Sequence, residues 1–227
     1  QDIRLAAGGD IVLMTDLDVG SGFVELDAGG SILGSGVITA SGLGLTVTGD
    51  VTLSTDLDTL TFTTTGGNVE IVEADDLTIG ASDTGGGDVD VTAAGGLTVE
   101  GIAGGSDIIS LTANGGALII TDPIIAALLG ITLLTSAGGI HGGQPPDVAE
   151  TRGDVEDLPA PISGGRVIVT ANGPIRMAAA GDLTVLLVQQ FAENDSILIT
   201  SAGVLTIDDA LTAGGGGELT LHAATLN

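Results

Sequence analysis

The stretch VTAAGGLTVEGIAGGSDIISLTANGGALII, residues 91–120, decides the fold because it holds one short phrase twice. In each copy an alternating apolar and polar segment runs into Ala or Asn and two glycines, and a second apolar segment follows. Alternation with a period of two is typical of a half-buried β-strand, and Gly and Asn are typical of sharp corners. The stretch therefore predicts strand, corner and strand, repeated after about 20 residues.

The same phrase recurs along most of the chain, for example at 5–13, 26–33 and 199–207. A period near 20 leaves room for about three short sides per turn, which predicts an all-β, single-stranded parallel β-helix (β-solenoid) of about nine or ten coils. We predict one such domain over residues 1–227, in which only 123–134 and 183–195 also permit a helix. A sharp corner needs positive φ, so we expect it at the corner glycines of the repeats. These are Gly8, Gly29, Gly49, Gly95, Gly115 and Gly138.

Composition limits the classes of partner and interior. The chain has 30 acidic and 4 basic residues, a net charge of −26, which excludes nucleic acid and anionic membranes, since both need a basic surface. The longest apolar run, at 123–134, is shorter than the roughly 20 residues of a membrane-spanning helix, so no membrane insertion is predicted. The absence of Trp, Tyr and Cys, with only three Phe, favours a thin aliphatic interior and excludes a disulfide scaffold.

The coil phrases resemble the haemagglutinin-type repeats of the filamentous haemagglutinin family, which comprises two-partner-secreted bacterial exoproteins and adhesins. The resemblance covers residues 3–140 and 167–222. It implies a right-handed parallel β-helix that is exported to the cell surface. The chain is much shorter than such adhesins and lacks the Asn-Pro-Asn-Gly of their secretion domain, so the resemblance implies a segment or a small relative.

The many carboxylates come without the other parts of a catalytic site. Acid pairs such as TDLD at 15–18 and EADD at 73–76 could serve a glycoside hydrolase, but the chain has no Lys, Tyr or Trp beside them. His141 and His222 are far apart and have no Ser or Cys partner at a recognisable spacing. The arginines are scattered: Arg4, Arg152, Arg166 and Arg176. We predict that the protein is not an enzyme and has no catalytic residue, and that its acids are solvated corner residues. A carbohydrate-active β-helix is the least favoured alternative.

Residues 141–166 interrupt the repeat, and we predict a loop insertion there within the solenoid. The stretch holds four of the six prolines and shows no alternation. It also contains Arg152-Gly153-Asp154, a tripeptide that many animal cell-surface receptors recognise. Loops on repeat scaffolds often carry binding groups, so these three residues are candidates for receptor binding. The open alternative is local pairing of Arg152 with a neighbouring acid.

The chain begins and finishes inside coil phrases, and no amphipathic capping helix is visible in either. An uncapped solenoid coil exposes unpaired backbone groups, so we expect either a longer solenoid or copies that stack head to tail through β-augmentation. The leading hypothesis is a non-enzymatic structural protein, extracellular or at the cell surface, that is a subunit or segment of a filament and has itself as partner. The runner-up is an adhesin that binds a host receptor or glycan, with the RGD loop as its receptor site. The only cofactor we consider is Ca²⁺, which would bridge acidic surfaces; no ligands are assigned to it.

Overall fold

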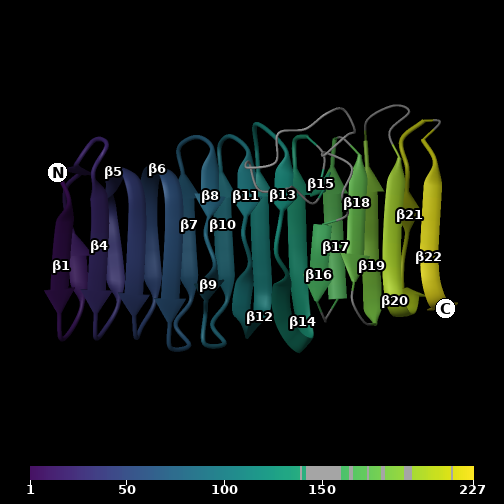
Figure 1. Ribbon diagram of the computed structural model, residues 1–227, viewed down its shortest axis with the longest axis horizontal. Helices are drawn as coiled ribbons and strands as arrows, with labels where there is room; N and C mark the ends of the chain where they lie inside the picture. The colour runs from purple at the N-terminus through teal and green to yellow at the C-terminus, as the bar shows by residue number, and fades with distance from the viewer. Residues whose placement is uncertain are drawn as a thin grey trace, which may run out of the picture.

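The computed structural model is a rod of β-coils stacked along one axis, with the two termini at opposite ends (Figure 1). It describes residues 1–138, 140–141, 160–163, 166–172, 174–179, 182–191, 196–215 and 217–227. The chain winds through about nine turns, and stacked coils lie about 20 residues apart, as predicted for a parallel β-solenoid. No helix occurs in these described ranges, hence none there that is long and apolar enough to cross a membrane.

All strands of the described ranges are joined into one continuous, parallel sheet that is wound into coils. Their bounds are β1 Ile3–Ala7, β2 Ile11–Leu13, β3 Leu17–Asp18, β4 Phe23–Ala28, β5 Ile32–Val47, β6 Val51–Thr64, β7 Val69–Glu73, β8 Leu77–Ile79, β9 Ser82–Asp83, β10 Val89–Ala93, β11 Leu97–Val99, β12 Ile102–Ala113, β13 Leu118–Ile120, β14 Ile124–Ser136, β15 Ile140–His141, β16 Ala160–Ser163, β17 Arg166–Ala171, β18 Ile175–Ala179, β19 Leu183–Gln190, β20 Ile197–Ile207, β21 Leu211–Thr212 and β22 Leu219–Leu226.

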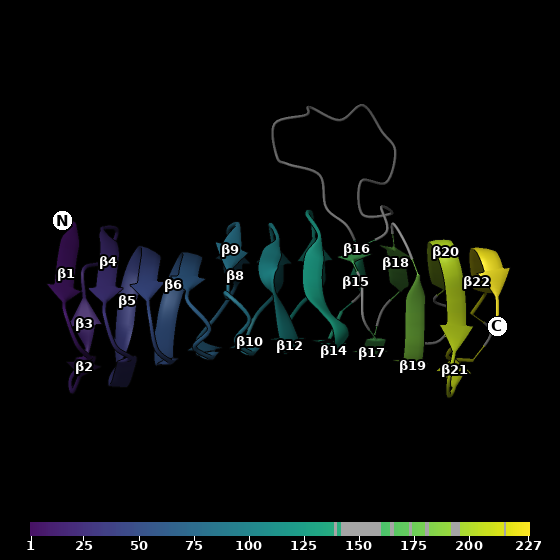
Figure 2. The same cartoon turned by 90° about the horizontal axis from the view of Figure 1, so that it is seen from below.

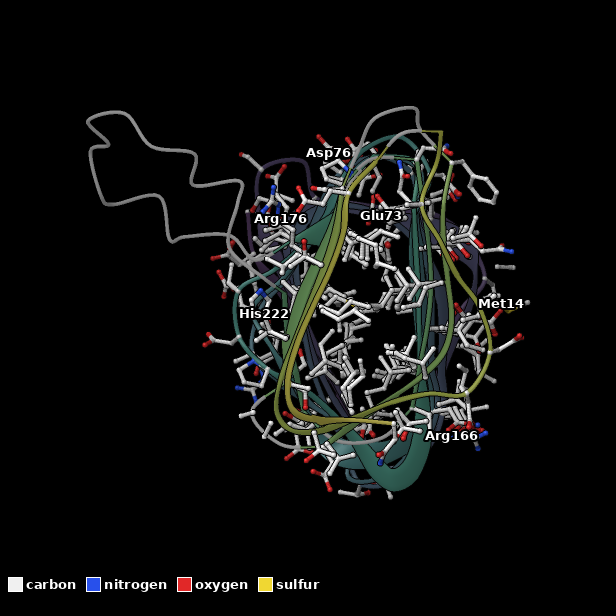
Figure 3. The ribbon with its side chains drawn as sticks, turned by 90° about the vertical axis from the view of Figure 1, so that its right-hand side faces the viewer. Met14, Glu73, Asp76, Arg166, Arg176 and His222 are labelled. Carbon is white, nitrogen blue, oxygen red and sulfur yellow. The ribbon has the colours of Figure 1, made fainter. Side chains whose placement is uncertain are left out.

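Like residues stack on like residues because the coils keep their register. Val24 of β4 pairs with Leu43 of β5, and Leu43 pairs with Leu60 of β6, all three with 0% exposure. The alternation seen in the sequence puts every second residue of a strand inside and its neighbours outside. Each buried aliphatic side chain contributes about 1.5–3 kcal/mol relative to the exposed state, and the interior is filled almost wholly by such chains (Figure 3).

Viewed along the rod, the cross-section is a flattened oval with two long faces (Figure 3). We call the face that contains β1, β4, β8 and β11 the first face, and the face that contains β2, β7, β10 and β17 the second face. His222 lies on the first face and Met14 on the second, whereas Asp76 and Arg166 lie at the two opposite corners (Figure 3). We call the corner at 8–10, 29–31, 48–50, 66–68 and 86–88 the ladder corner, and the corner at 74–76, 94–96 and 114–116 the Glu73 corner.

The two stretches that permitted a helix are strands. Residues 124–136 form β14, which pairs with β12 and β17, and residues 183–190 form β19, which pairs with β17, β20 and β21. Within the predicted insertion at 141–166, residues 160–163 form β16, which lies between β14 and β18 (Figure 2). Residues 142–159 lie outside the described ranges. The sheet therefore resumes before the end of the predicted insertion.

The six corner glycines of the repeats lie at bends, but they do not have the positive φ that we expected there. Positive φ occurs at Gly20, Gly66, Gly85, Gly86 and Gly101, and at none of the six corner glycines of the repeats. At Gly29 and Gly115 the preceding coil leaves no room for a side chain. A Cβ at Gly29 would lie 2.6 Å from the carbonyl oxygen of Gly8, and one at Gly115 would lie 2.5 Å from that of Ala94.

The corner phrase also occurs at both ends of the oval. Gly8, Gly29 and Gly49 lie at the ladder corner, where the chain passes from the first face to the second. Gly95, Gly115 and Gly138 follow β10, β12 and β14 and lie at the Glu73 corner, where the chain returns to the first face. One sequence phrase therefore occurs at both corners, and at each corner a glycine, Gly29 or Gly115, has no room for a Cβ beside the preceding coil.

Candidate functional site

Glu73 is a carboxylate inside the Glu73 corner. It is the last residue of β7, where the alternation Val69, Ile71, Glu73 points it inward, and it is 1% exposed (Figure 3). Its Oε2 accepts a hydrogen bond of 2.7 Å from the Thr55 hydroxyl. Its Oε1 accepts bonds of 3.0 Å and 2.8 Å from the backbone N–H groups of Leu57 and Ala74. Both oxygens of the buried carboxylate are thus engaged with donors, as buried polar groups require.

Burial and hydrogen bonding act on Glu73 in opposite directions. Desolvation raises the pKa of the Glu73 carboxyl, while the bonds from Thr55, Leu57 and Ala74 lower it, and the balance lies above the ordinary value. Oxygens of Asp56, Glu73 and Asp75 lie within 4.8 Å of one another, and such oxygens suit hard cations. The two Glu73 oxygens already accept hydrogen bonds from three donors. Glu73 is therefore primarily a structural carboxylate that holds the backbone of this corner in place.

A second group of acidic residues caps the backbone from one coil to the next. At the ladder corner, Asp10 Oδ1 accepts from the N–H of Ser31 at 2.8 Å, and Ser31 Oγ accepts from the N–H of Asp50 at 3.1 Å. Asp50 Oδ1 accepts from Asn68 N–H at 2.9 Å, Asn68 Oδ1 accepts from Asp88 N–H at 3.0 Å, and Asp88 Oδ1 accepts from Ile108 N–H at 2.9 Å. We call this series the corner ladder.

Other acids make the same contact elsewhere. Asp2, Asp16, Asp76 and Asp182 each accept a backbone N–H from the following coil. The prediction that the acids are solvated corner residues is therefore incomplete: many sit at corners, but their carboxylates also join consecutive coils. This use explains why a chain of net charge −26 retains acids at such regular positions.

The outer surface of the first face carries two depressions. A groove of about 530 Å³ crosses β8, β11 and β13, with Asp58, Asp76, Thr78, Thr98 and Ile119 among its lining residues. A smaller hollow of about 280 Å³ lies beside the ring of Phe23, which is 42% exposed. Threonines at 46, 61 and 63 line this smaller hollow together with Glu25. The first face is thus richer in hydroxyl groups than in charge around Phe23.

The stretch TLTFTTT, residues 59–65, is rich in threonine and raises the question of an ice-binding face. Thr59, Thr61 and Thr63 alternate with buried Leu60, Phe62 and Thr64 along β6. The neighbouring outward positions of β5 that pair with them are Gly42, Gly44 and Thr46. A ladder of threonines in every coil, which an ice-binding face would require, is therefore interrupted directly next to this strand.

The remaining candidate residues are the Arg-Gly-Asp tripeptide, the two histidines and the arginines. Arg152, Gly153 and Asp154 lie outside the described residues, so receptor binding through them stays a prediction. His222 is exposed on β22, as expected for a solvent-facing strand residue, and His141 belongs to β15. Arg4 Nε lies 3.5 Å from Glu25 Oε2, and Arg4 Nη2 lies 4.0 Å from Asp27 Oδ2; both carboxylates belong to β4 of the next coil.

Sequence reasoning missed Glu73 and Phe23, although the signal for both was present. In VEIVE the alternation that buries Val69 and Ile71 also places Glu73 inside. In FVELDA the alternation that buries Val24 and Leu26 places Phe23 outside. What the alternation could not supply was the neighbour in the adjacent coil, which decides whether a carboxylate finds donors or a ring finds a flat support.

Comparison of the chain with family models, with curated proteins and with solved structures finds no match. The structure alone therefore supports the parallel β-solenoid fold. The resemblance to the haemagglutinin-type repeats rests on the repeated sequence phrases alone.

Proposed function

We propose that this chain is a structural β-solenoid of the haemagglutinin-repeat type, a subunit or segment of an extracellular fibre at the cell surface, without catalytic activity. One observation carries the proposal: the apolar core columns are still apolar where they reach the end coils. Leu5 of β1 is 39% exposed, whereas Leu26, its partner in the next coil, is 0% exposed. At the other end Leu219 is 43% exposed, whereas its partner Ile197 is 0% exposed.

A further coil on either end would bury these side chains and pair the open strand edges. Exposed edges of this kind recruit additional strands, because their N–H and C=O groups are unsatisfied by protein. The coil could come from a second copy of the chain or from more coils of a longer polypeptide. Head-to-tail stacking of copies that does not close would give a filament.

Charge favours growth at the ends over growth at the sides. With a net charge of −26, lateral contacts bring acidic surfaces together, whereas the end coils present apolar core columns. Side-by-side bundling of rods then depends on screening or on bridging by Ca²⁺. This division gives a fibre that lengthens readily and bundles only when cations are present.

The test compares two leucines that are equally exposed and differ in direction. Leu5 faces the core column of the end coil and is 39% exposed, whereas Leu33 faces outward on the second face and is 40% exposed. Sedimentation velocity and negative-stain electron microscopy over a range of protein concentrations should show rods that lengthen in the wild type. Leu5→Asp should abolish lengthening, because it places a charge in the contact, while Leu33→Asp should leave it intact.

Rods of one constant length at every concentration would refute stacking of copies. Equal loss of lengthening in both variants would show that added charge, and not the end coil, controls association. Far-UV circular dichroism of each variant checks that the solenoid itself has folded. A Leu219→Asp variant tests the opposite end independently and should also stop growth.

A further inference from the structure

Phe23 is an outward-facing aromatic residue that does not belong to the apolar core. It is the outward-facing first residue of β4, next to buried Val24, and it is 42% exposed. Its ring lies over two glycines of β5, the next coil. A Cβ at Gly42 would lie 2.8 Å from Phe23 Cδ2 and Cε2, and a Cβ at Gly44 would lie 3.3 Å from Cε1 and Cζ.

These contacts fix the orientation of the ring. Atoms on both sides of the ring approach the two glycines, which alternate along one strand, so one face of the ring rests on the glycine backbone. Phe23 is still 42% exposed, so part of the ring remains accessible to solvent. The shelf of Gly42 and Gly44 therefore presents a flat, immobilised aromatic surface on the outside of the rod.

Polar groups surround this surface on the side away from the rod end. The hollow of about 280 Å³ beside the ring is lined by Phe23, Glu25, Thr46, Thr61, Thr63 and Ala81. Arg4 Nε lies 3.5 Å from Glu25 Oε2 and so restrains the carboxylate at the edge of the hollow. Its volume is close to the lower limit of about 300 Å³ for ordinary ligand pockets, so it suits a single small ring of a longer ligand.

We propose that this hollow, the Phe23 site, binds a sugar ring of a neutral glycan. A pyranose has an apolar C–H face that can lie on the phenyl ring, and it has hydroxyl groups at its rim that can bond to threonine hydroxyls and a carboxylate. The net charge of −26 and the nearby Glu25 disfavour an anionic ligand. The Phe23 ring, the threonine hydroxyls and the acidic surroundings together favour a neutral carbohydrate as the ligand.

The small residues beyond the hollow leave room for a chain of sugars. Gly44 pairs with Thr61 of β6, and a Cβ at Gly80 of the following coil would lie 2.8 Å from Thr61 Cγ2. The line from Gly44 through Thr61 to Gly80 runs across three coils along the rod. A glycan that is anchored on Phe23 can continue over this low line of residues. The site does not depend on the fibre proposed above, since every residue in it lies within coils of one chain.

The experiment uses cellohexaose and N-acetylchitohexaose as neutral probes and the whole chain labelled at its methyl groups. Methyl resonances report well here because Thr46, Thr61 and Thr63 each carry one at the hollow. We expect saturable shifts centred on these three threonines with at least one probe, and an affinity measured in parallel by calorimetry. No saturable shift with either probe at millimolar concentration would overturn the proposal.

Variants distinguish stacking of the sugar on the Phe23 ring from non-specific binding to exposed aromatic residues. Phe23→Ala and Phe23→Leu should each lower the affinity about tenfold or more, since Leu keeps the apolar bulk but lacks the flat ring. Phe191→Ala is the matched control, because Phe191 is also an exposed phenylalanine, at 60%, on another coil. Its affinity should equal that of the wild type. Thr61→Val removes only a hydroxyl at constant shape and should weaken binding severalfold.

Binding that survives Phe23→Leu and Thr61→Val would also overturn the proposal. Loss of binding in Phe191→Ala would show that exposed aromatic residues act non-specifically. Lengthening of rods, measured as above, should be unchanged in Phe23→Leu, so failure of the glycan site and failure of the fibre give different results.

Discussion

Glu73 illustrates how one buried carboxylate can make the stability of a fold depend on pH. Its carboxylate is 1% exposed, and burial raises its pKa above the ordinary value. The folded protein therefore holds this proton more tightly than the unfolded chain does. Glu73 favours the folded state most below its unfolded pKa, and this contribution is lost as the pH rises through the folded pKa. In return, it satisfies the N–H groups of Leu57 and Ala74.

Two substitutions at Glu73 separate charge from hydrogen bonding. Glu73→Gln keeps an oxygen for the two N–H groups and removes the charge, so its stability relative to the wild type should rise from pH 4 to pH 7.5. Glu73→Ala removes the acceptor of the Leu57 N–H and of the Thr55 hydroxyl, both buried, and should cost about 2–4 kcal/mol at pH 4 and less at pH 7.5. Urea unfolding followed by far-UV circular dichroism measures both. A Gln variant whose relative stability falls with pH would contradict this account.

At the scale of strands and corners, the corner ladder makes acidic residues part of the coil-to-coil register. Asp50→Ala removes the acceptor for Asn68 N–H and should lower stability by about 1 kcal/mol, as for loss of a capping side chain. Asp90→Ala is the matched control, since Asp90 lies opposite Glu70 on the second face, and like charges in that arrangement destabilise a sheet. The control should be neutral or stabilising.

Urea unfolding at 150 mM NaCl distinguishes the two explanations by sign. If charge alone mattered, both substitutions would stabilise the protein, because both remove one negative charge from an acidic surface. Destabilisation by Asp50→Ala together with neutrality of Asp90→Ala supports the ladder. The same change in both variants would be inconsistent with it.

The strands and corners also show how far the sequence alone determines this structure. Alternation in VDVTA and LTV predicts β10 and β11 because a strand's inside and outside are local properties. Crowding at Gly29 or Gly115 and the flat support under Phe23 involve a coil about 20 residues away, and the register between coils is not local. The position of the glycines was therefore predictable, whereas the steric reason for them and the Phe23 site required the stacked coils.

The whole molecule combines an apolar axis with a strongly acidic exterior. Its buried apolar residues form one cluster through the stacked coils of the described ranges, while its net charge of −26 is distributed over the long faces and corners. Rods should therefore meet end to end at low salt but repel one another sideways. Repulsion between exposed charges is reduced when the screening length falls from about 30 Å at 0.01 M salt to about 8 Å at 0.15 M.

Ca²⁺ should change the lateral association of rods in a way that NaCl at equal ionic strength does not. Screening by NaCl weakens repulsion, but only a divalent cation can bind carboxylates from two rods at once. Electron microscopy should show single rods in NaCl, bundles after addition of millimolar CaCl₂, and single rods again after addition of EDTA. Leu5→Asp, which blocks lengthening, should still bundle with Ca²⁺, because the side contacts do not involve the end coil. Equal bundling in NaCl and CaCl₂ would show that screening suffices and that the cation forms no bridge.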